Sequence, residues 1–266
     1  MNMKKLAVIL FGLIAGCWQF QSWAEPPRNQ AQSRAQVHTE LGAAYYSRGQ
    51  LAVALEELKA AVNSDARYAP AYNMLGLVYM ELLEFSQAEE SFQRAFSLDE
   101  NNPEFHNNYG WFLCQRGRAD DAIKHFFTAL KNPLYATPEK SYVNAGVCSI
   151  KKGDVEGAET FFLKVLKLRA QEPQALYYLS ELAGKRKDYF EAKNYLAQLL
   201  QTVAPGPEIL WLAVRIERQL GNREAEAGYG AQLRKHFPDS REALALRSSQ
   251  YDYSEFAKLN GQKVTK

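Results

Sequence analysis

Residues 107–114 read NNYGWFLC. Two earlier stretches, NMLGLVYM at 73–80 and TELGAAYY at 39–46, have the same pattern: a large residue, then a glycine, then another large residue three positions after the glycine. The three glycines, Gly42, Gly76 and Gly110, are spaced at a constant 34 residues (76 − 42 = 34 and 110 − 76 = 34). A 34-residue period is typical of tetratricopeptide repeats, in which each unit is a pair of antiparallel helices. These stretches therefore predict an all-α fold.

Small residues recur where the two helices of each unit would cross, because Ala54, Ala88 and Ala122 each follow a repeat glycine by 12 residues (54 − 42 = 88 − 76 = 122 − 110 = 12). A single helix pair cannot bury its own apolar face, so the units are expected to stack. A fourth unit surrounds Gly146 after a two-residue insertion (146 − 110 = 36), and two looser units follow. We predict a right-handed superhelical solenoid of about six repeats with a C-terminal capping helix.

The repeat register divides the chain, and prolines close to the start of the second to sixth units mark the same boundaries. The expected segments are a signal peptide at 1–16, a lipidated N-terminus and tether at 17–34, repeats at 35–68, 69–102, 103–138, 139–172, 173–206 and 207–238, and a capping helix with a polar tail at 239–266. The capping helix is expected at about 240–248, and the tail from Tyr251 onward.

The first two dozen residues have the features of an export signal. Two lysines at positions 4 and 5 precede an apolar stretch, residues 6–15, which is shorter than the roughly 20 residues that a transmembrane helix needs. The following run, IAGC at 14–17, resembles a bacterial lipobox, so we expect Cys17 to be acylated and to anchor the protein on a membrane. The alternative is ordinary secretion with cleavage after Ala24.

The composition argues against several functional classes. The formal net charge is only +2 and no basic block occurs, so nucleic-acid binding is not expected. The four histidines fit no metal-ligand spacing, and the chain contains no phosphate loop, nucleophile elbow or H-E-x-x-H run. We therefore expect no enzyme activity, no cofactor, no metal and no small-molecule substrate.

Cys114 and Cys148 also lie one period apart (148 − 114 = 34), on the first helices of neighbouring units. An exported protein works where disulfides persist, and acylation or removal of Cys17 leaves an even number of thiols. A bridge needs Cα atoms within about 7 Å, and the insertion shifts the two cysteines relative to each other. The sequence leaves two alternatives, a disulfide or two buried free thiols.

The first helices of such repeats are expected to line a concave surface that binds an extended peptide. Asparagine amides can donate to and accept from a peptide backbone, and Trp111 offers a large anchoring surface. The alternative is that these side chains pack against neighbouring helices or against the C-terminal tail. The candidate groove residues share this side of the first helices: Asn73, Met74, Leu77, Met80, Asn107, Asn108, Trp111, Asn144, Val147, Tyr177 and Tyr178.

With the lipobox, the repeats and the run from Asn107 to Cys114 in view, the chain resembles the family of type IV pilus biogenesis lipoproteins called PilW or PilF. The resemblance covers nearly the whole sequence. NNYGWFLC is its most specific segment, because a plain repeat consensus requires neither Asn-Asn before Tyr-Gly nor Trp-Phe-Leu-Cys after it.

The resemblance implies a pilotin, an outer-membrane lipoprotein that helps the pilus secretin to reach the outer membrane and to multimerise there. Cys17 matches the acylated cysteine of this family, and Cys114 with Cys148 matches its cysteine pair. Trp18 follows Cys17 where lipoproteins held in the inner membrane carry Asp, so the resemblance points to the periplasmic face of the outer membrane. The implied partner is a PilQ-like secretin. A general periplasmic scaffold for envelope or peptidoglycan assembly is the alternative, since its repeats would look alike.

Overall fold

The computed structural model describes residues 30–251. The predicted signal peptide, Cys17, most of the tether and residues 252–266 lie outside this part of the chain. Residues 30–251 form thirteen α-helices and no strand, so the predicted all-α solenoid is confirmed. The helices are α1 (Gln30–Ser47), α2 (Leu51–Ser64), α3 (Ala69–Glu81), α4 (Phe85–Leu98), α5 (Pro103–Gln115), α6 (Ala119–Leu130), α7 (Pro138–Lys152), α8 (Val155–Leu168), α9 (Pro173–Lys185), α10 (Tyr189–Thr202), α11 (Pro207–Gln219), α12 (Arg223–His236) and α13 (Arg241–Arg247).

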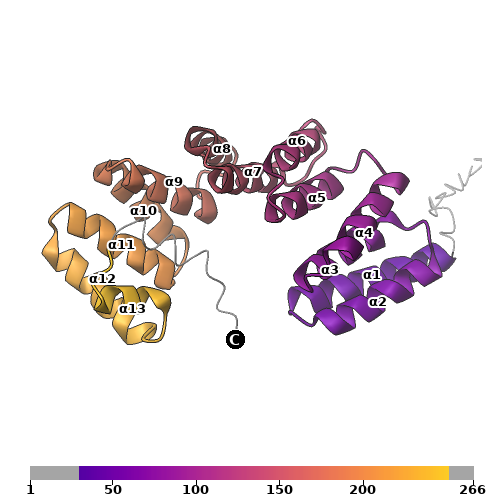
Figure 1. The fold of residues 1–266 in the computed structure, drawn as a ribbon, viewed down its shortest axis with the longest axis horizontal. Helices are drawn as coiled ribbons and strands as arrows, with labels where there is room; N and C mark the ends of the chain where they lie inside the picture. Colours follow the sequence, from indigo (N-terminus) through magenta and orange to yellow (C-terminus); the bar gives the residue numbers. More distant parts are fainter. Residues whose placement is uncertain (1–29, 252–266) are drawn as a thin grey trace, which may run out of the picture.

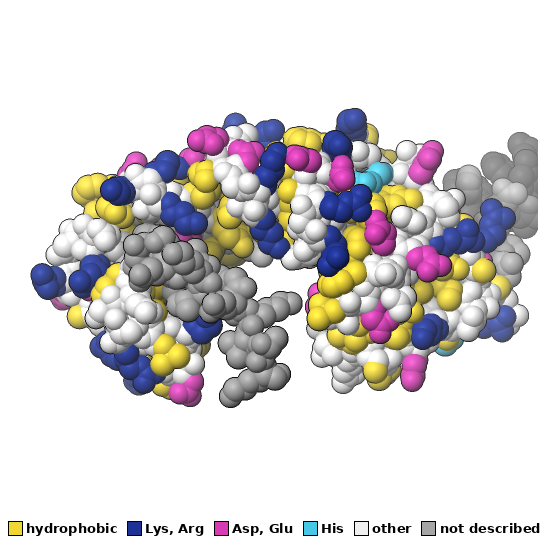
Figure 2. All heavy atoms as spheres, in the orientation of Figure 1, with side chains coloured by type: hydrophobic (Ala, Val, Ile, Leu, Met, Phe, Trp, Pro, Cys, Tyr) yellow, Lys and Arg dark blue, Asp and Glu magenta, His cyan; other side chains and the backbone are white. Residues whose placement is uncertain are grey.

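Consecutive helices pair into six repeats, from α1 with α2 to α11 with α12, and α13 closes the array. First helices touch in four of the five pairs of neighbouring repeats, because α1 contacts α3, α3 contacts α5, α5 contacts α7 and α9 contacts α11; repeat 4 meets repeat 5 mainly through α8 and α9. The stack bends into an arch with α5 and α7 on its inner side and α6 and α8 on its outer side (Figure 1). Figure 2 shows that the surface is hollowed on the inner side of this arch.

Each repeat starts and turns at a fixed position. Pro70, Pro103, Pro138, Pro173 and Pro207 lie in the first turns of α3, α5, α7, α9 and α11, where a missing N–H and a fixed φ are tolerated. The turn between the two helices of each repeat contains one residue with positive φ. It is a glycine in four repeats, but Leu83 (φ 63°) and Lys187 (φ 67°) hold it in the second and fifth. Those two turns carry a local backbone cost of about 1 kcal/mol that a glycine avoids.

Glycines at the helix crossings allow the closest approach within a repeat. A Cβ added to Gly146 would lie 2.6 Å from the ring of Phe162, and one added to Gly110 would lie 2.7 Å from that of Phe126. The sixth repeat reverses this arrangement of sizes. Val214 holds the small-residue position there (214 − 146 = 68, two periods), and Gly230 holds the position of the bulky ring (230 − 162 = 68). The small residue has moved to the other helix of the pair.

The end of the array is covered by α13, which contacts both α11 and α12. Ala243 and Ala245 of α13 are buried in one cluster with Trp211 and Leu233. The expectation that a polar tail begins at Tyr251 was wrong for that residue, because its ring stacks on Trp211 with the centroids 5.4 Å apart. Among residues 30–251, no helix is both long and apolar enough to span a bilayer.

Candidate functional site

The inner side of the arch presents a row of half-buried side chains from the first helices. The row follows α3, α5 and α7: its members on α3 are both apolar, and on α5 and α7 an asparagine is followed one turn later by an apolar residue. We call this surface the inner groove; its members are Met74, Leu77, Asn108, Trp111, Asn144 and Val147. These six predicted groove residues are the ones that a bound segment could reach in repeats 2–4.

Three predicted groove residues are placed elsewhere, which corrects the sequence-based assignment. Asn73, Met80 and Asn107 are buried, at 6%, 7% and 5% exposure. The amide of Asn107 accepts from Asn144 Nδ2 and from Ser141 Oγ, both at 3.0 Å. A buried amide needs such partners, since an unpaired one costs about 1–3 kcal/mol. The repeated asparagines therefore join neighbouring first helices.

These amides form a chain across three repeats. Asn108 Nδ2 donates to Asn73 Oδ1 at 3.3 Å and Asn107 Nδ2 donates to Asn108 Oδ1 at 3.3 Å. Asn108 and Asn144 are the half-buried members, so each presents an amide edge at the floor of the inner groove. A backbone N–H or C=O of a bound segment can pair with these edges.

Trp111 is the largest side chain at the centre of the inner groove. The ammonium of Lys151 lies 5.4 Å from the centre of its ring and donates to Oε1 of Gln115 at 2.6 Å. Burial lowers the pKa of Lys151. A half-buried indole beside a cation is the kind of surface that anchors a protein partner.

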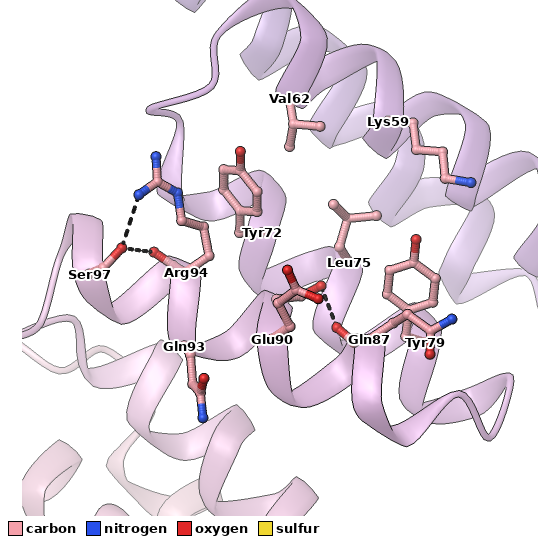
Figure 3. Close-up of a pocket in the computed structure, with 11 residues that line it drawn as sticks. Lys59, Val62, Tyr72, Leu75, Tyr79, Gln87, Glu90, Gln93, Arg94 and Ser97 are labelled. Carbon is pink, nitrogen blue, oxygen red and sulfur yellow. Dashed lines mark hydrogen bonds between the residues drawn. The ribbon is translucent and has the colours of Figure 1, made fainter.

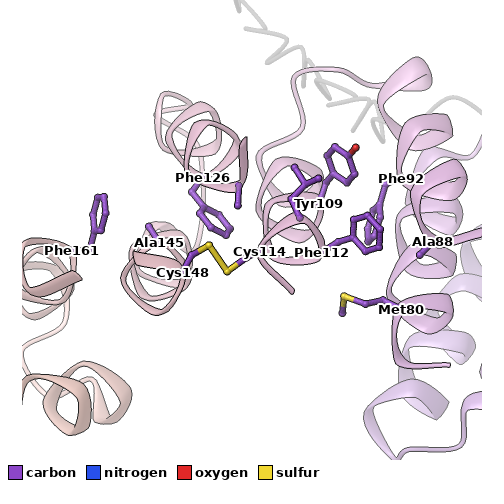
Figure 4. Close-up of a cluster of buried hydrophobic side chains, with 12 residues drawn as sticks. Met80, Ala88, Phe92, Tyr109, Phe112, Cys114, Phe126, Ala145, Cys148 and Phe161 are labelled. Carbon is purple, nitrogen blue, oxygen red and sulfur yellow. A yellow bond between two sulfur atoms is a disulfide. The ribbon is translucent and has the colours of Figure 1, made fainter. Parts of the chain in front are cut away.

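Cys114 and Cys148 form a disulfide between α5 and α7, with their Cα atoms 5.7 Å apart. Both residues are buried in a cluster with Phe112, Phe126 and Ala145, which Figure 4 shows around the bridge. The covalent link ties together the two helices that carry Trp111 and Val147. Of the two alternatives left by the sequence, the structure contains the bridge.

Two histidines form a packed pair between α5 and α6. His106 Nε2 lies 2.9 Å from the carbonyl oxygen of Glu100, which can only accept, so this nitrogen carries the proton. His106 Nδ1 is then the acceptor for His125 Nδ1–H at 2.9 Å. Burial lowers the pKa of His125 to about 4 and also lowers that of His106. Within residues 30–251, no group of three or more His, Cys, Asp or Glu side chains could hold a metal ion.

The inner side of repeats 5 and 6 has a different character. A hollow of about 500 Å³ lies between α9 and α11, lined by Pro173, Gln174, Tyr177, Tyr178, Leu199, Val203, Glu208 and Ile209. Burial raises the pKa of both tyrosines. A smaller hollow of about 290 Å³ shares Gln174 with it and continues toward Asn144. Tyr177 and Tyr178 are thus brought to a pocket at the end of the groove.

An ion pair lies beside this pocket. The guanidinium of Arg215 on α11 bonds to Glu181 on α9, and Arg215 is only 2% exposed. Glu217, also buried, accepts from Lys193 Nζ at 2.9 Å and from Asn222 Nδ2 at 3.0 Å. Repeats 5 and 6 are therefore joined by two ion pairs, each with one buried member.

A third hollow lies on another side of the array, between α2 and α4. Its volume is about 640 Å³, and Tyr72, Leu75 and Tyr79 of α3 form its floor (Figure 3). Its rim is polar, with Lys59 on one side and Arg94 on the other. None of the predicted groove residues lines it.

Sequence reasoning missed Glu181, Arg215 and the histidine pair. The sequence does contain a signal for the pair of Glu181 and Arg215, because these opposite charges lie one repeat period apart (215 − 181 = 34). The histidines are 19 residues apart, and so are His38 and Glu57, whose Nδ1 and Oε2 atoms are 2.7 Å apart in the first repeat. Cys17, the predicted lipidation site, lies outside the described residues.

Comparison with protein families supports the repeat assignment. Models described as TPR repeat or tetratricopeptide repeat match residues 35–82, 69–102, 91–124, 139–172 and 174–203. Together these matches reach from the first repeat into the fifth.

Comparison with individual proteins is more specific. The chain is 27% identical over 237 residues to the type IV pilus assembly protein PilF of Pseudomonas aeruginosa, covering 89% of this chain and 93% of that protein. The crystal structure of PilW, described as a widely conserved type IV pilus biogenesis factor, matches with a TM-score of 0.74 at 30% identity, over 82% of this chain and 99% of that one. A structure of Pseudomonas aeruginosa PilF matches with the same TM-score at 26% identity, over 83% and 100%.

Proposed function

The chain belongs to the family of tetratricopeptide-repeat proteins that includes the type IV pilus biogenesis factors PilW and PilF, and we propose that it acts as a pilotin. In this role it binds a pilus secretin and promotes the arrival of the secretin at the outer membrane and its multimerisation there. The role requires binding and no catalytic step.

The observation that carries this proposal is the inner groove around Trp111. Its floor combines a half-buried indole with the amide edges of Asn108 and Asn144. Such a surface suits an extended or helical segment, because the amides pair with backbone and the ring takes up an apolar side chain. The disulfide between Cys114 and Cys148 stiffens this surface, so less ordering entropy is lost when a partner binds.

We further propose that Cys17 is acylated and that the protein is held on the periplasmic face of the outer membrane. Buried fatty chains contribute about 0.8 kcal/mol per methylene, so several chains make an effectively permanent anchor. Gln30, the first residue of α1, comes 13 positions after Cys17 (30 − 17 = 13). At about 3.3 Å per extended residue this segment reaches up to roughly 40 Å. That reach allows the inner groove to meet secretin subunits near the membrane surface.

The test is secretin multimer formation in cells that contain the wild-type protein, the Cys17→Ala variant or no protein, resolved on gels of separated membrane fractions. We expect multimers to disappear without the protein, and to be mislocalised with Cys17→Ala. Unchanged multimers in all three strains, with altered cell shape or a leaky outer membrane instead, would replace the pilotin by a general envelope scaffold.

A further inference from the structure

The chain turns back onto α11 after α13. Arg247 ends this short helix, Ser249 adopts a positive φ of 55°, and Tyr251 stacks on Trp211 with an interplanar angle of 25°. The guanidinium of Arg218, also on α11, lies 4.0 Å from the centre of the Tyr251 ring. Tyr251 is therefore held on α11 by two side chains.

The position of Tyr251 on α11 places the start of residues 252–266 close to a pocket. Glu208, Trp211, Arg215 and Arg218 occupy positions i, i+3, i+7 and i+10 and so share one side of α11. Tyr251 covers the part of this stripe from Arg218 to Trp211. The next residue of the stripe, Glu208, is only about 4.5 Å further along the helix axis at 1.5 Å per residue. Glu208 belongs to the wall of the pocket between α9 and α11.

The chemistry of this pocket defines its ligand. Tyr177, Tyr178 and Ile209 provide apolar and aromatic walls, and the exposed carboxylate of Glu208 lies at the rim. A fitting ligand is an extended peptide with a large apolar side chain and a lysine close to it.

Residues 252–266 have this composition. They read DYSEFAKLNGQKVTK, with Phe256 and Leu259 on either side of Lys258, and with further lysines at 263 and 266. Their net charge is +1, from three lysines against Asp252 and Glu255. Phe256 comes five positions after Tyr251, a span of up to roughly 16 Å at 3.3 Å per residue, which is ample for the distance to Glu208.

We propose that residues 252–266 are the resident ligand of the pocket between α9 and α11, and that a partner entering the groove there must displace them. Phe256 or Leu259 fills the apolar pocket, and Lys258 pairs with Glu208. The tether is short, so the local concentration of this segment is in the millimolar range and a peptide from another protein competes at a disadvantage. This inference rests on the proposed role of the inner groove, but its test does not involve a secretin.

The first test is photo-crosslinking in the intact chain. A benzophenone amino acid replaces Ile209 in the pocket wall, and in a matched variant it replaces Phe190, an exposed apolar residue at 76% that does not line the pocket. After irradiation and digestion, we expect the main crosslink from position 209 to map to residues 252–266, with none of this product from position 190. Crosslinks from 209 that map elsewhere, or equal tail products from both positions, would overturn the proposal.

The second test measures binding of a fluorescent synthetic peptide with the sequence of residues 252–266. We expect it to bind a chain truncated after Tyr251 at least tenfold more tightly than the intact chain, whose own segment occupies the pocket. A peptide with Phe256→Ser and Leu259→Ser should lose most of this affinity. Equal binding to both chains, or an unaffected double variant, would contradict the proposal while leaving the secretin assay to decide the proposed function separately.

Discussion

Repeats 2–4 and repeats 5–6 share one helix-pair geometry, but different chemistry joins their neighbouring first helices. In repeats 2–4 the joints are neutral: asparagine amides linked in a chain and the disulfide between Cys114 and Cys148. In repeats 5–6 the first helices are joined by an ion pair, the buried Arg215 with Glu181, and the buried Glu217 of α11 pairs in addition with Lys193 of the second helix α10. The repeat fold fixes where helices meet, and the residues at the joints are free to differ.

The difference is also seen on the inner surface. The neutral joints leave Trp111 and the amides of Asn108 and Asn144 at the floor of the groove. The equivalents of Trp111 are Glu181 in repeat 5 (181 − 111 = 70, two periods plus the two-residue insertion) and Arg215 in repeat 6 (215 − 111 = 104, three periods plus the insertion), and they pair with each other. The first region thus suits apolar partner side chains over a polar backbone, and the second offers a separate aromatic pocket.

The largest expected effect comes from removing the disulfide. Cys114→Ala with Cys148→Ala should lower the free energy of unfolding by about 3–4 kcal/mol, because the bridge closes a loop of about 34 residues in the unfolded chain. Urea unfolding measures this change. Ser149→Ala is the matched control, since Ser149 Oγ is buried without a hydrogen-bond partner among the described residues and its removal should cost little. A double variant as stable as that control would mean that the bridge does not hold repeats 3 and 4 together.

The helix crossings give the next largest effect. Gly146→Val should cost about 3 kcal/mol, since the added Cβ alone would lie 2.6 Å from the ring of Phe162 and a tightly packed crossing resists larger side chains. Gly228→Ala, in a part of α12 with open space around it, should instead add up to about 1 kcal/mol. Thermal unfolding of the two variants makes the comparison. Equal effects at both sites would refute the close-approach role of Gly146.

The ion pair of repeats 5–6 should give a smaller effect. Glu181→Gln leaves Arg215 buried beside a neutral amide and is expected to cost about 2 kcal/mol, mainly in α9 and α11. Adding Arg215→Met should recover most of the loss, because the buried guanidinium that had lost its carboxylate partner is then removed. Hydrogen exchange resolved by helix tests both statements. If the double variant is as unstable as the single one, the charge is not the cause.

The histidine pair predicts a pH dependence confined to repeat 3. The folded-state pKa of His125 is about 4, below the usual 6.5, so the unfolded chain takes up protons first. The contribution of His125 to the free energy of unfolding should therefore be complete above about pH 6.5 and should decrease as the pH falls toward 4. The charge of Arg118 lowers the pKa of His125 further, and the charge of Asp121 raises it. The variant His106→Tyr with His125→Phe copies Tyr142 and Phe161, the corresponding pair of repeat 4, and should flatten this part of the stability profile. An unchanged slope would assign the pH dependence to other groups.

The sequence predicted the array well because its determinants repeat. Glycines mark the crossings of the first four repeats and prolines mark the helix starts of the last five, so Gly110 and Pro103 indicate the same pair of helices independently. The joints between repeats were harder to predict. An asparagine recurs at the position of Asn107, which is also the pattern expected of a groove residue. This position instead faces the first helix of the following repeat, and only the packed structure shows that Asn107 is 5% exposed.

The placement of Tyr251 could not be predicted for a different reason. A single aromatic at the start of a polar stretch carries no periodic signal, and its contact with Trp211 depends on the turn at Ser249. Cys148 is an intermediate case. Its spacing from Cys114 indicated that the two cysteines lie on neighbouring first helices. Their Cα separation of 5.7 Å, however, depends on how the fold accommodates the insertion before α7.

The most direct test of the inner groove compares secretin multimers in strains carrying Trp111→Ala or Phe190→Ala, with circular dichroism used to confirm that both variants are folded. Both changes remove an aromatic ring, one from the centre of the inner groove and one from a residue that is 76% exposed and does not line the groove. We predict that Trp111→Ala reduces multimers at least fivefold while Phe190→Ala leaves them at the wild-type level. Normal multimers with Trp111→Ala would contradict the assignment of the inner groove of repeats 2–4 as the partner-binding surface.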